Sequence, residues 1–77
     1  MVTIKLFGTL RLKTGCKVIE ADVSTVKEGL EALAEATGLS YKELKQCITV
    51  VNGAQTKLSA PLQSGDELAL FSPSGGG

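Results

Sequence analysis

The chain has 77 residues, of which 43% are hydrophobic and 21% charged, and its eight basic side chains balance eight acidic ones. A chain of this length buries only about 60% of its unfolded surface, so one small domain without a deep cofactor cavity is expected. Catalysis by the chain alone is therefore not expected. The net charge of zero argues against partners held mainly by charge, such as nucleic acid or an anionic membrane.

Residues that hold metals or move protons near neutral pH are scarce. The sequence has no histidine, so neither a histidine general base nor a zinc site is expected. The first ten residues alternate in polarity and lack the apolar run of a secretory leader, which predicts a cytoplasmic protein. In that compartment Cys16 and Cys47 are expected to be thiols, more often buried as small hydrophobes than functional, with a disulfide as the alternative. No stretch approaches the roughly 18 apolar residues of a membrane span.

Polarity alternates over residues 2–7, with Val2, Ile4 and Leu6 on one side, which predicts a strand with one face on a core. Gly8 signals a turn, and residues 9–15 are interpreted as a loop. Residues 17–23 again place apolar side chains at every second position. The chain is thus expected to begin with a hairpin that has a wide first loop.

A helix is predicted after Thr25, which has the capping-box spacing to Glu28. Apolar residues then recur at helical spacing and place one stripe against the sheet: Val26, Leu30, Leu33 and Ala34. Gly38 suits the left-handed residue that commonly ends a helix. Gly29 costs about 1 kcal/mol relative to alanine within a helix, and a close backbone approach would explain it.

The second half of the chain predicts a short helix and three strands. Ser40 and Glu43 repeat the capping-box spacing before a helix over 41–46. A strand over 48–51 follows, closed by Asn52-Gly53, the dipeptide best suited to a tight hairpin turn. Residues 56–58 are interpreted as a short return strand, and residues 67–71 as the last strand.

This element order predicts an α+β roll, a mixed sheet with one main helix packed on one face. Strand parity places Phe7 and Phe71 on the face without the helix. If the first and last strands are neighbours, the two rings form one exposed apolar patch, which would mark an interaction surface. The alternative is that one or both rings fold over a sheet edge.

The domain is expected to span residues 1–71, because residues 72–77 have no apolar side chain with which to dock on a core. Those six residues predict a flexible tail that reaches at most about 20 Å. Glycine lacks a Cβ, so Gly75, Gly76 and Gly77 would pass through a narrow channel. The terminal carboxyl, ionised at neutral pH, could attack the α-phosphate of a nucleotide. An inert linker is the alternative interpretation.

The whole chain resembles the ubiquitin-like β-grasp sulfur carriers, and most closely the small subunits of molybdopterin synthase. The resemblance rests on the strand and helix order, on Leu10-Arg11 and Gly15, on Val51-Asn52-Gly53, and on the run 62–71 that leads through Pro73 to Gly76-Gly77. The Gly65-Asp66-Glu67 turn before an apolar strand and a terminal Gly-Gly is its specific part. The Asn-Gly hairpin is generic.

The resemblance implies a sulfur carrier that is not catalytic alone. A ubiquitin-activating-like adenylyltransferase would use ATP and magnesium to adenylate Gly77, and a sulfur donor enzyme would convert the carboxyl to a thiocarboxylate. The tail, with Pro73, Gly75 and Gly76 guided through a channel, would then donate sulfur to a pyranopterin precursor in the large synthase subunit. This chain would bind no cofactor or metal itself.

The resemblance also implies that Phe7 and Phe71 contact the partner proteins. Arg11 would either help docking or be a solvated loop charge. Two departures from the family are a single proline after the last strand and Gln55 where an apolar contact is expected. These changes imply a freer tail and a smaller patch.

Other acceptors of the sulfur stay open. Similar carriers serve thiamine, cysteine and transfer-RNA thiolation, and some modify protein lysines. The long first loop with Leu10-Arg11 favours the molybdopterin branch. The remaining alternative is a different class of protein, an interaction module that keeps the ubiquitin-like fold and has an inert tail.

Overall fold

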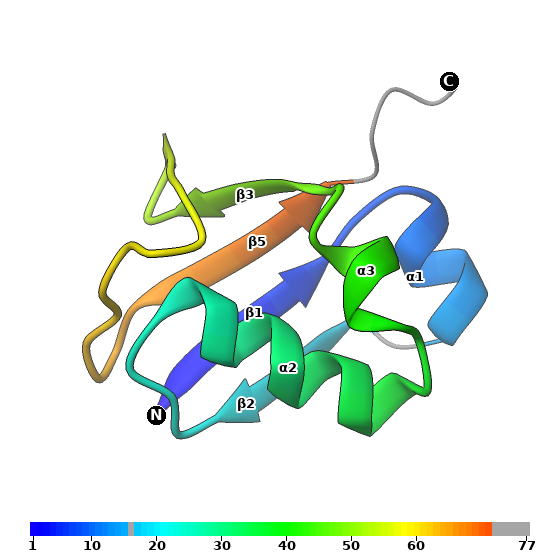
Figure 1. Ribbon diagram of the computed structural model, residues 1–77, viewed down its shortest axis with the longest axis horizontal. Helices are drawn as coiled ribbons and strands as arrows, with labels where there is room; N and C mark the ends of the chain where they lie inside the picture. Colours follow the sequence, from blue (N-terminus) through cyan, green and yellow to red (C-terminus); the bar gives the residue numbers. More distant parts are fainter. Residues whose placement is uncertain (16, 72–77) are drawn as a thin grey trace.

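The computed structural model describes residues 1–15 and 17–71 (Figure 1). Predictions that concern Cys16 and residues 72–77, including Pro73, Gly75, Gly76 and Gly77, lie outside the described residues. The elements of the described residues are, in chain order, β1 (Val2–Leu6), α1 (Thr9–Thr14), β2 (Val18–Ala21), α2 (Val26–Thr37), α3 (Tyr41–Leu44), β3 (Ile48–Val51), β4 (Ala54–Gln55) and β5 (Glu67–Phe71).

The strands form one mixed sheet in the order β2-β1-β5-β3-β4. The first and last strands, β1 and β5, are parallel neighbours, whereas the β1–β2, β3–β5 and β3–β4 pairs are antiparallel. Helix α2 lies across one face of the sheet (Figure 1). This arrangement confirms the predicted α+β roll with one main helix on one face.

The core lies between α2 and the sheet. The fully buried side chains come from β1, α2, α3 and β5: Val2, Ile4, Leu6, Val26, Leu30, Leu33, Leu44, Leu68 and Leu70. At Gly29 an added Cβ would lie 3.0 Å from Leu68 Cδ2 and 3.6 Å from Ile4 Cδ1. The missing side chain therefore lets α2 lie close to the sheet, as the sequence indicated.

The predicted helix caps are present in both helices that follow β2. Thr25 Oγ1 accepts a hydrogen bond from the Glu28 amide at 3.2 Å. Glu28 Oε1 accepts one from the Ser24 amide at 2.8 Å, one residue earlier than in a standard capping box. Gly38 closes α2 with φ 82°, and Ser40 Oγ caps α3.

The interpretation of residues 9–15 as a loop is wrong, because Thr9–Thr14 forms α1. Leu10 is only 3% exposed, so one side chain of this turn of helix packs into the core. Gly15 ends the helix in the left-handed conformation, with φ 68°. One anchoring side chain and a glycine cap are enough to fold a segment too short to show helical periodicity.

The predicted return strand over 56–58 is also wrong, because β4 is formed by Ala54 and Gln55. Asn52 and Gly53 both have positive φ, 50° and 87°. A two-residue turn of this kind pairs the residues that flank it directly, so Val51 pairs with Ala54. The remaining differences are small: β2 is shorter than 17–23, and α3 ends at Leu44.

Asp66 ties the β3–β4 turn to the start of β5. Its carboxylate accepts hydrogen bonds from Asn52 Nδ2 at 3.1 Å and from the Gln63 amide at 2.8 Å, and Asn52 Oδ1 accepts one from the Glu67 amide at 3.0 Å. The bonds from Gln63 and, second, from Asn52 lower the pKa of Asp66 below its ordinary value of 3.8. The charged form of Asp66 therefore belongs to the folded arrangement of this turn.

Cys47 is buried as a member of the core, with Sγ 3.8 Å from the Glu43 carbonyl oxygen. Its burial agrees with the interpretation of this thiol as a small hydrophobe.

Among the described residues, no helix is long and apolar enough to cross a membrane.

Candidate functional site

Two aromatic rings lie side by side at one end of the sheet. Phe71 is the last residue of β5, and Phe7 follows β1, held there by a hydrogen bond from its amide to the Leu70 carbonyl at 3.0 Å. The rings stack with centroids 4.8 Å apart and planes 11° from parallel. Stacked pairs of this kind contribute about 0.5 to 1.5 kcal/mol beyond the area that they bury. The rings therefore hold each other in place.

Both rings lie on the face of the sheet opposite α2. Helix α2 packs on Ile4 and Leu68, and side chains alternate along β1 and β5, so Phe7 and Phe71 face the other way. Phe71 is 38% exposed and Phe7 is half-buried. The two strands are central in the sheet, so the rings form the exposed pair that the sequence predicts and do not fold over an edge.

Ile48 extends this surface and was not among the residues that the sequence singled out. It pairs with Phe71 across β3 and β5, so both side chains lie on the same face, and it is 42% exposed. Phe7, Phe71 and Ile48 together are called the aromatic patch below. Only the strand register places Ile48 there, and no local sequence signal could have revealed it.

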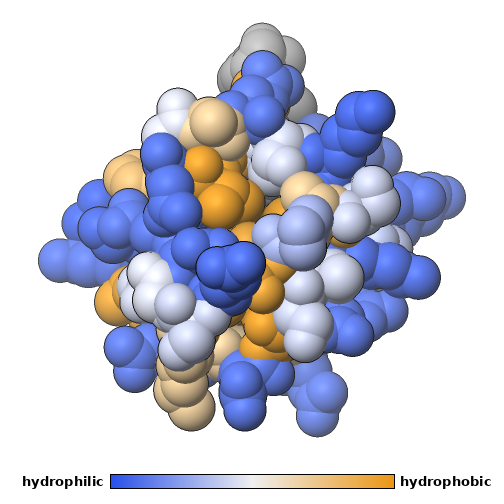
Figure 2. All heavy atoms as spheres, turned by 90° about the vertical axis from the view of Figure 1, so that its left-hand side faces the viewer, coloured by the Kyte–Doolittle hydropathy of each residue, from blue (hydrophilic) through white to orange (hydrophobic). Residues whose placement is uncertain are grey.

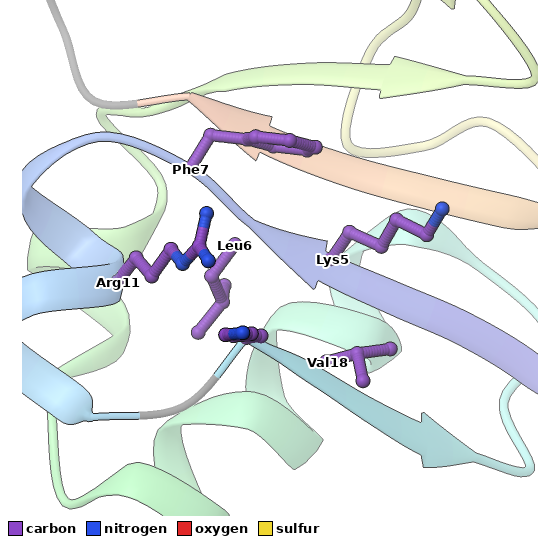
Figure 3. A pocket seen from close by; sticks show the side chains of 6 residues that line it. Lys5, Leu6, Phe7, Arg11 and Val18 are labelled. Atoms are coloured by element: carbon purple, nitrogen blue, oxygen red, sulfur yellow. The ribbon is translucent and has the colours of Figure 1, made fainter.

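A pocket of about 250 Å³ adjoins the aromatic patch beside Phe7 (Figure 3). We call it the basic pocket, and the residues that line it are Lys5, Leu6, Phe7, Arg11, Lys17 and Val18. Arg11 reaches across from α1 toward Phe7, while Lys5 and Val18 come from the neighbouring strands β1 and β2 (Figure 3). Arg11 thus stands on a helix beside the patch and not in the loop that the sequence predicted.

Backbone pairing brings the other lining residues to the same place. Lys5 pairs with Val18 across β1 and β2, so their side chains share the face opposite α2. The Leu6 amide donates to the Lys17 carbonyl at 2.9 Å, which holds Lys17 beside the end of β1. Val18 is 48% exposed. The wall of the basic pocket is thus fixed by the sheet on one side and by α1 on the other.

The charged side chains that line the basic pocket all have the same sign. Among the described residues that line it, three are cations and none is a carboxylate. Lys5 Nζ lies 3.3 Å from Glu67 Oε2, in an ion pair whose two side chains are roughly half exposed. Within the part of the chain that the structure describes, neither Arg11 nor Lys17 has a carboxylate within salt-bridge distance.

The opposite end of the same strands has a different character. Asp66 and Glu67 stand at the start of β5, and Glu20 pairs with Thr3 at the start of β1. Figure 2 views the molecule from the left side of Figure 1 and shows mostly hydrophilic side chains, with apolar atoms between them. Carboxylates thus stand at the start of β5 and beside the start of β1, and that of Glu67 reaches Lys5 in the ion pair described above.

The structure brings together three of the residues predicted from the sequence: Phe7, Phe71 and Arg11. Gln55 is exposed on β4 at the far side of β3. Within residues 1–15 and 17–71, no three His, Cys, Asp or Glu side chains are grouped so that they could hold a metal ion.

Comparison with known proteins gives one family and several solved structures. The model of the ThiS family matches residues 4–77. The chain superposes on the crystal structure of SAMP1 from Haloferax volcanii with a TM-score of 0.86 and 31% identity, over 99% of this chain and 98% of that one. No curated protein sequence matches.

Two further structures are complexes of proteins. In the BexX/CysO complex from Amycolatopsis orientalis the matching chain is 26% identical, with a TM-score of 0.80 and full coverage of both chains. In the complex of subunits 1 and 2 of the molybdopterin-converting factor from Helicobacter pylori it is 25% identical, with a TM-score of 0.68, over 99% of this chain and 97% of that one.

Proposed function

The chain belongs to the ThiS family and has the ubiquitin-like β-grasp fold of the sulfur carriers. On this premise we propose that it carries sulfur as a thiocarboxylate on Gly77. The observation that carries the proposal is the position of the aromatic patch. Phe71 is both a member of the patch and the residue from which the segment 72–77 continues, so a partner that binds the patch lies where that segment begins.

The chemistry requires only the carboxyl group of the chain, provided that Gly77 is the last residue of the working protein. The carboxylate attacks the α-phosphorus of ATP, pyrophosphate leaves, and an acyl adenylate forms. Sulfide, supplied by a sulfur donor enzyme, then attacks the acyl carbon, AMP leaves, and the thiocarboxylate remains. In this proposal ATP and magnesium are bound by the activating adenylyltransferase and not by this chain.

The chain itself contributes recognition. Its patch offers two stacked rings and Ile48 as a preformed apolar surface, and docking such a surface costs little side-chain entropy because the rings already fix each other. The segment 72–77 offers three glycines in sequence, which pass through a channel that any side chain would block. In this proposal the partner enzymes catalyse the reactions, and this chain binds them and supplies the reacting carboxyl group.

For the acceptor, we propose the pyranopterin precursor of molybdopterin, with the chain acting as the small subunit of the synthase. Support comes from the similarity to one subunit of the Helicobacter pylori molybdopterin-converting factor, which was solved together with its other subunit. The segment between β1 and β2, which is long enough to form α1 and to place Arg11 beside the patch, agrees with this branch.

Mass spectrometry of the intact chain tests sulfur carriage. After incubation with the activating enzyme, ATP and a sulfur donor, the mass is expected to rise by the difference between a sulfur and an oxygen atom. Loaded chain is then mixed with the large synthase subunit and the pyranopterin precursor, and the mass should return to its starting value as sulfur leaves. An unchanged mass with every cognate activating enzyme would rule out carriage.

A second candidate function is conjugation to lysine side chains of other proteins. It is favoured by the 31% identity to SAMP1 and by a second structure from Haloferax volcanii, that of small archaeal modifier protein 1, which is 29% identical over 94% of this chain. The two functions share the adenylation step. Incubation in cell extract with ATP distinguishes the two functions. A protein modifier forms covalent adducts of higher mass there, whereas a dedicated sulfur donor does not.

A further inference from the structure

The basic pocket has no role in the chemistry proposed for Gly77. We propose that it binds a carboxylate side chain of a partner protein, an aspartate or glutamate that lies beside an apolar side chain of the same partner. The pocket would then fix how the partner is oriented on the aromatic patch. This inference rests on the proposed function, since it names the chemistry of the partner surface that meets the same face of the sheet.

The charges define the sign of the group that is bound. Arg11 lines the pocket from α1, Lys17 lines it from the segment just before β2, and Lys5 lines it from β1. Lys5 is already paired with Glu67. Among the described residues of the pocket, the positive charge that no carboxylate balances is therefore that of Arg11 and Lys17. An arginine is well suited to a carboxylate, because its planar guanidinium donates two parallel hydrogen bonds.

The apolar lining of the pocket indicates that the bound carboxylate is attached to an apolar group. Leu6, Phe7 and Val18 contribute carbon surface to the pocket, and Phe7 also belongs to the stacked pair. A bare inorganic anion would leave this surface exposed to water, whereas a carboxylate on a side chain brings methylene groups that cover it. The mixture of cations and apolar groups therefore favours a side chain over a free phosphate.

A protein is also a better match than a nucleotide. The pocket of about 250 Å³ lies just below the usual range of ligand sites, and it shares Phe7 with the apolar surface that includes Phe71 and Ile48. A protein partner covers both surfaces at once, with apolar contacts on the patch and one charge-assisted contact in the pocket. Such an arrangement places an apolar centre next to a polar rim, as protein interfaces commonly do.

The first test uses small probes and the full chain. Phenylacetate, which joins a carboxylate to an apolar ring, is titrated into the ¹⁵N-labelled protein at low salt and followed by NMR. Saturable shifts are expected at the amides of Phe7, Arg11, Lys17 and Val18. The neutral isostere phenylacetamide should not produce them. Raising the salt to a few tenths molar should weaken them, because the screening length of exposed charges is about 10 Å at 0.1 M and falls further as salt is added.

Charge reversal provides the matched variants. The double substitution Arg11→Glu with Lys17→Glu should weaken phenylacetate binding about tenfold, since each exposed pair contributes up to about 1 kcal/mol. The control is the double substitution Lys27→Glu with Lys57→Glu, which changes the net charge equally at exposed positions that do not line the pocket. If the reversed variant does not fold, Arg11→Ala and Lys17→Gln are used in its place, with dispersed spectra as the criterion of folding.

The second test uses the partner. Affinity of the activating enzyme or of the large synthase subunit should fall at least about tenfold in the reversed variant and stay within about twofold in the control. A lysine placed at the matching aspartate or glutamate of the partner should restore binding to the reversed variant. That rescue is the result that a merely structural role of Arg11 and Lys17 would not produce.

The outcomes separate this inference from the proposed function. If the pocket amides respond equally to inorganic phosphate, or more strongly to ATP than to phenylacetate, the pocket is a free-anion site and the inference is overturned. If sulfur loading proceeds in the wild type and partner affinity is unchanged in the reversed variant, the inference is also overturned while sulfur carriage stands. Pocket binding and partner rescue without any loading would support the inference and reject the carrier function.

Discussion

Phe71 stacks on Phe7 across two parallel strands that are central in the sheet, with ring centroids 4.8 Å apart. Parallel pairing places the carboxyl ends of β1 and β5 together, although Phe7 and Phe71 lie at opposite ends of the domain sequence. A partner that contacts both rings therefore binds only the folded domain, because the unfolded chain does not bring the two rings together. The same pairing places the basic pocket and the last described residue at one end of the molecule.

Phe71→Ala should reduce partner binding more than it reduces stability. Phe71 is 38% exposed, so its deletion should cost about 1 to 2 kcal/mol, below the 3 to 5 kcal/mol of a buried aromatic. Partner affinity is expected to fall at least about tenfold if the ring is a central contact. Chemical denaturation and calorimetric titration measure the two effects.

Leu70→Ala is the matched control for Phe71→Ala. Leu70 is adjacent in β5 but fully buried on the helix side of the sheet, and its truncation should cost about 2 to 5 kcal/mol. If the two substitutions destabilise the domain equally, Phe71 belongs to the core and the aromatic patch is not available for docking.

Gly29→Val should destabilise the domain by about 1 to 3 kcal/mol. A Cβ at this position would already lie 3.0 Å from Leu68 Cδ2, so the branched side chain would push α2 away from the sheet. Ala36→Val, at an exposed position of the same helix, should cost only a few tenths of a kcal/mol from helix propensity. Equal losses in the two variants, measured by thermal unfolding, would show that α2 has room above Leu68.

Asp66 should make the domain sensitive to acid. Its folded pKa is lowered by the hydrogen bonds from Gln63 and Asn52, so its contribution to stability is present above its ordinary pKa of 3.8 and is lost as the pH falls through the lowered folded value. Asp66→Asn should therefore flatten the dependence of stability on pH in this acidic range. Asp22→Asn, at an exposed position outside this turn, serves as the control. Parallel pH curves for wild type and Asp66→Asn would contradict the assignment.

Removal of Gly77, or replacement of Gly76 by phenylalanine, should abolish sulfur loading without changing the melting temperature. The reason is that the buried core of the described residues runs from Val2 to Leu70. Intact mass after incubation with activating enzyme, ATP and sulfur donor reports loading, and calorimetry reports stability. Ser72→Ala, in the same segment, should load normally. A melting temperature lowered by several degrees would show that the segment after Phe71 supports the fold.

The parts of the fold that could be predicted from the sequence are those with a local cause. Thr25 with Glu28, Asn52 with Gly53, and the alternation over residues 2–7 each involve neighbours in sequence, and all three appear in the structure. Helix α1 was not predicted because a helix of about a turn and a half is too short to show a helical period of apolar residues. The burial of Leu10 depends on contacts with residues far away in the sequence, which no local pattern shows.

The candidate site divides in the same way. Parity along the strands was enough to place Phe7 and Phe71 on the open face. Ile48 and Lys17 were missed, since one depends on the register between β3 and β5 and the other on the hydrogen bond between the Leu6 amide and the Lys17 carbonyl. The sign of the basic pocket was hidden for the same reason, because composition reports a balance and not its distribution.

The central position of β5 has a mechanical consequence. β5 is paired on one side with β1 and on the other with β3, so a pull on the chain beyond Phe71 acts along both hydrogen-bond ladders at once. A pull along the axis of β5 loads both ladders in shear, whereas the same pull on an edge strand would load only one ladder. A partner can therefore grip and draw on the end of this chain while the domain behind it keeps its shape.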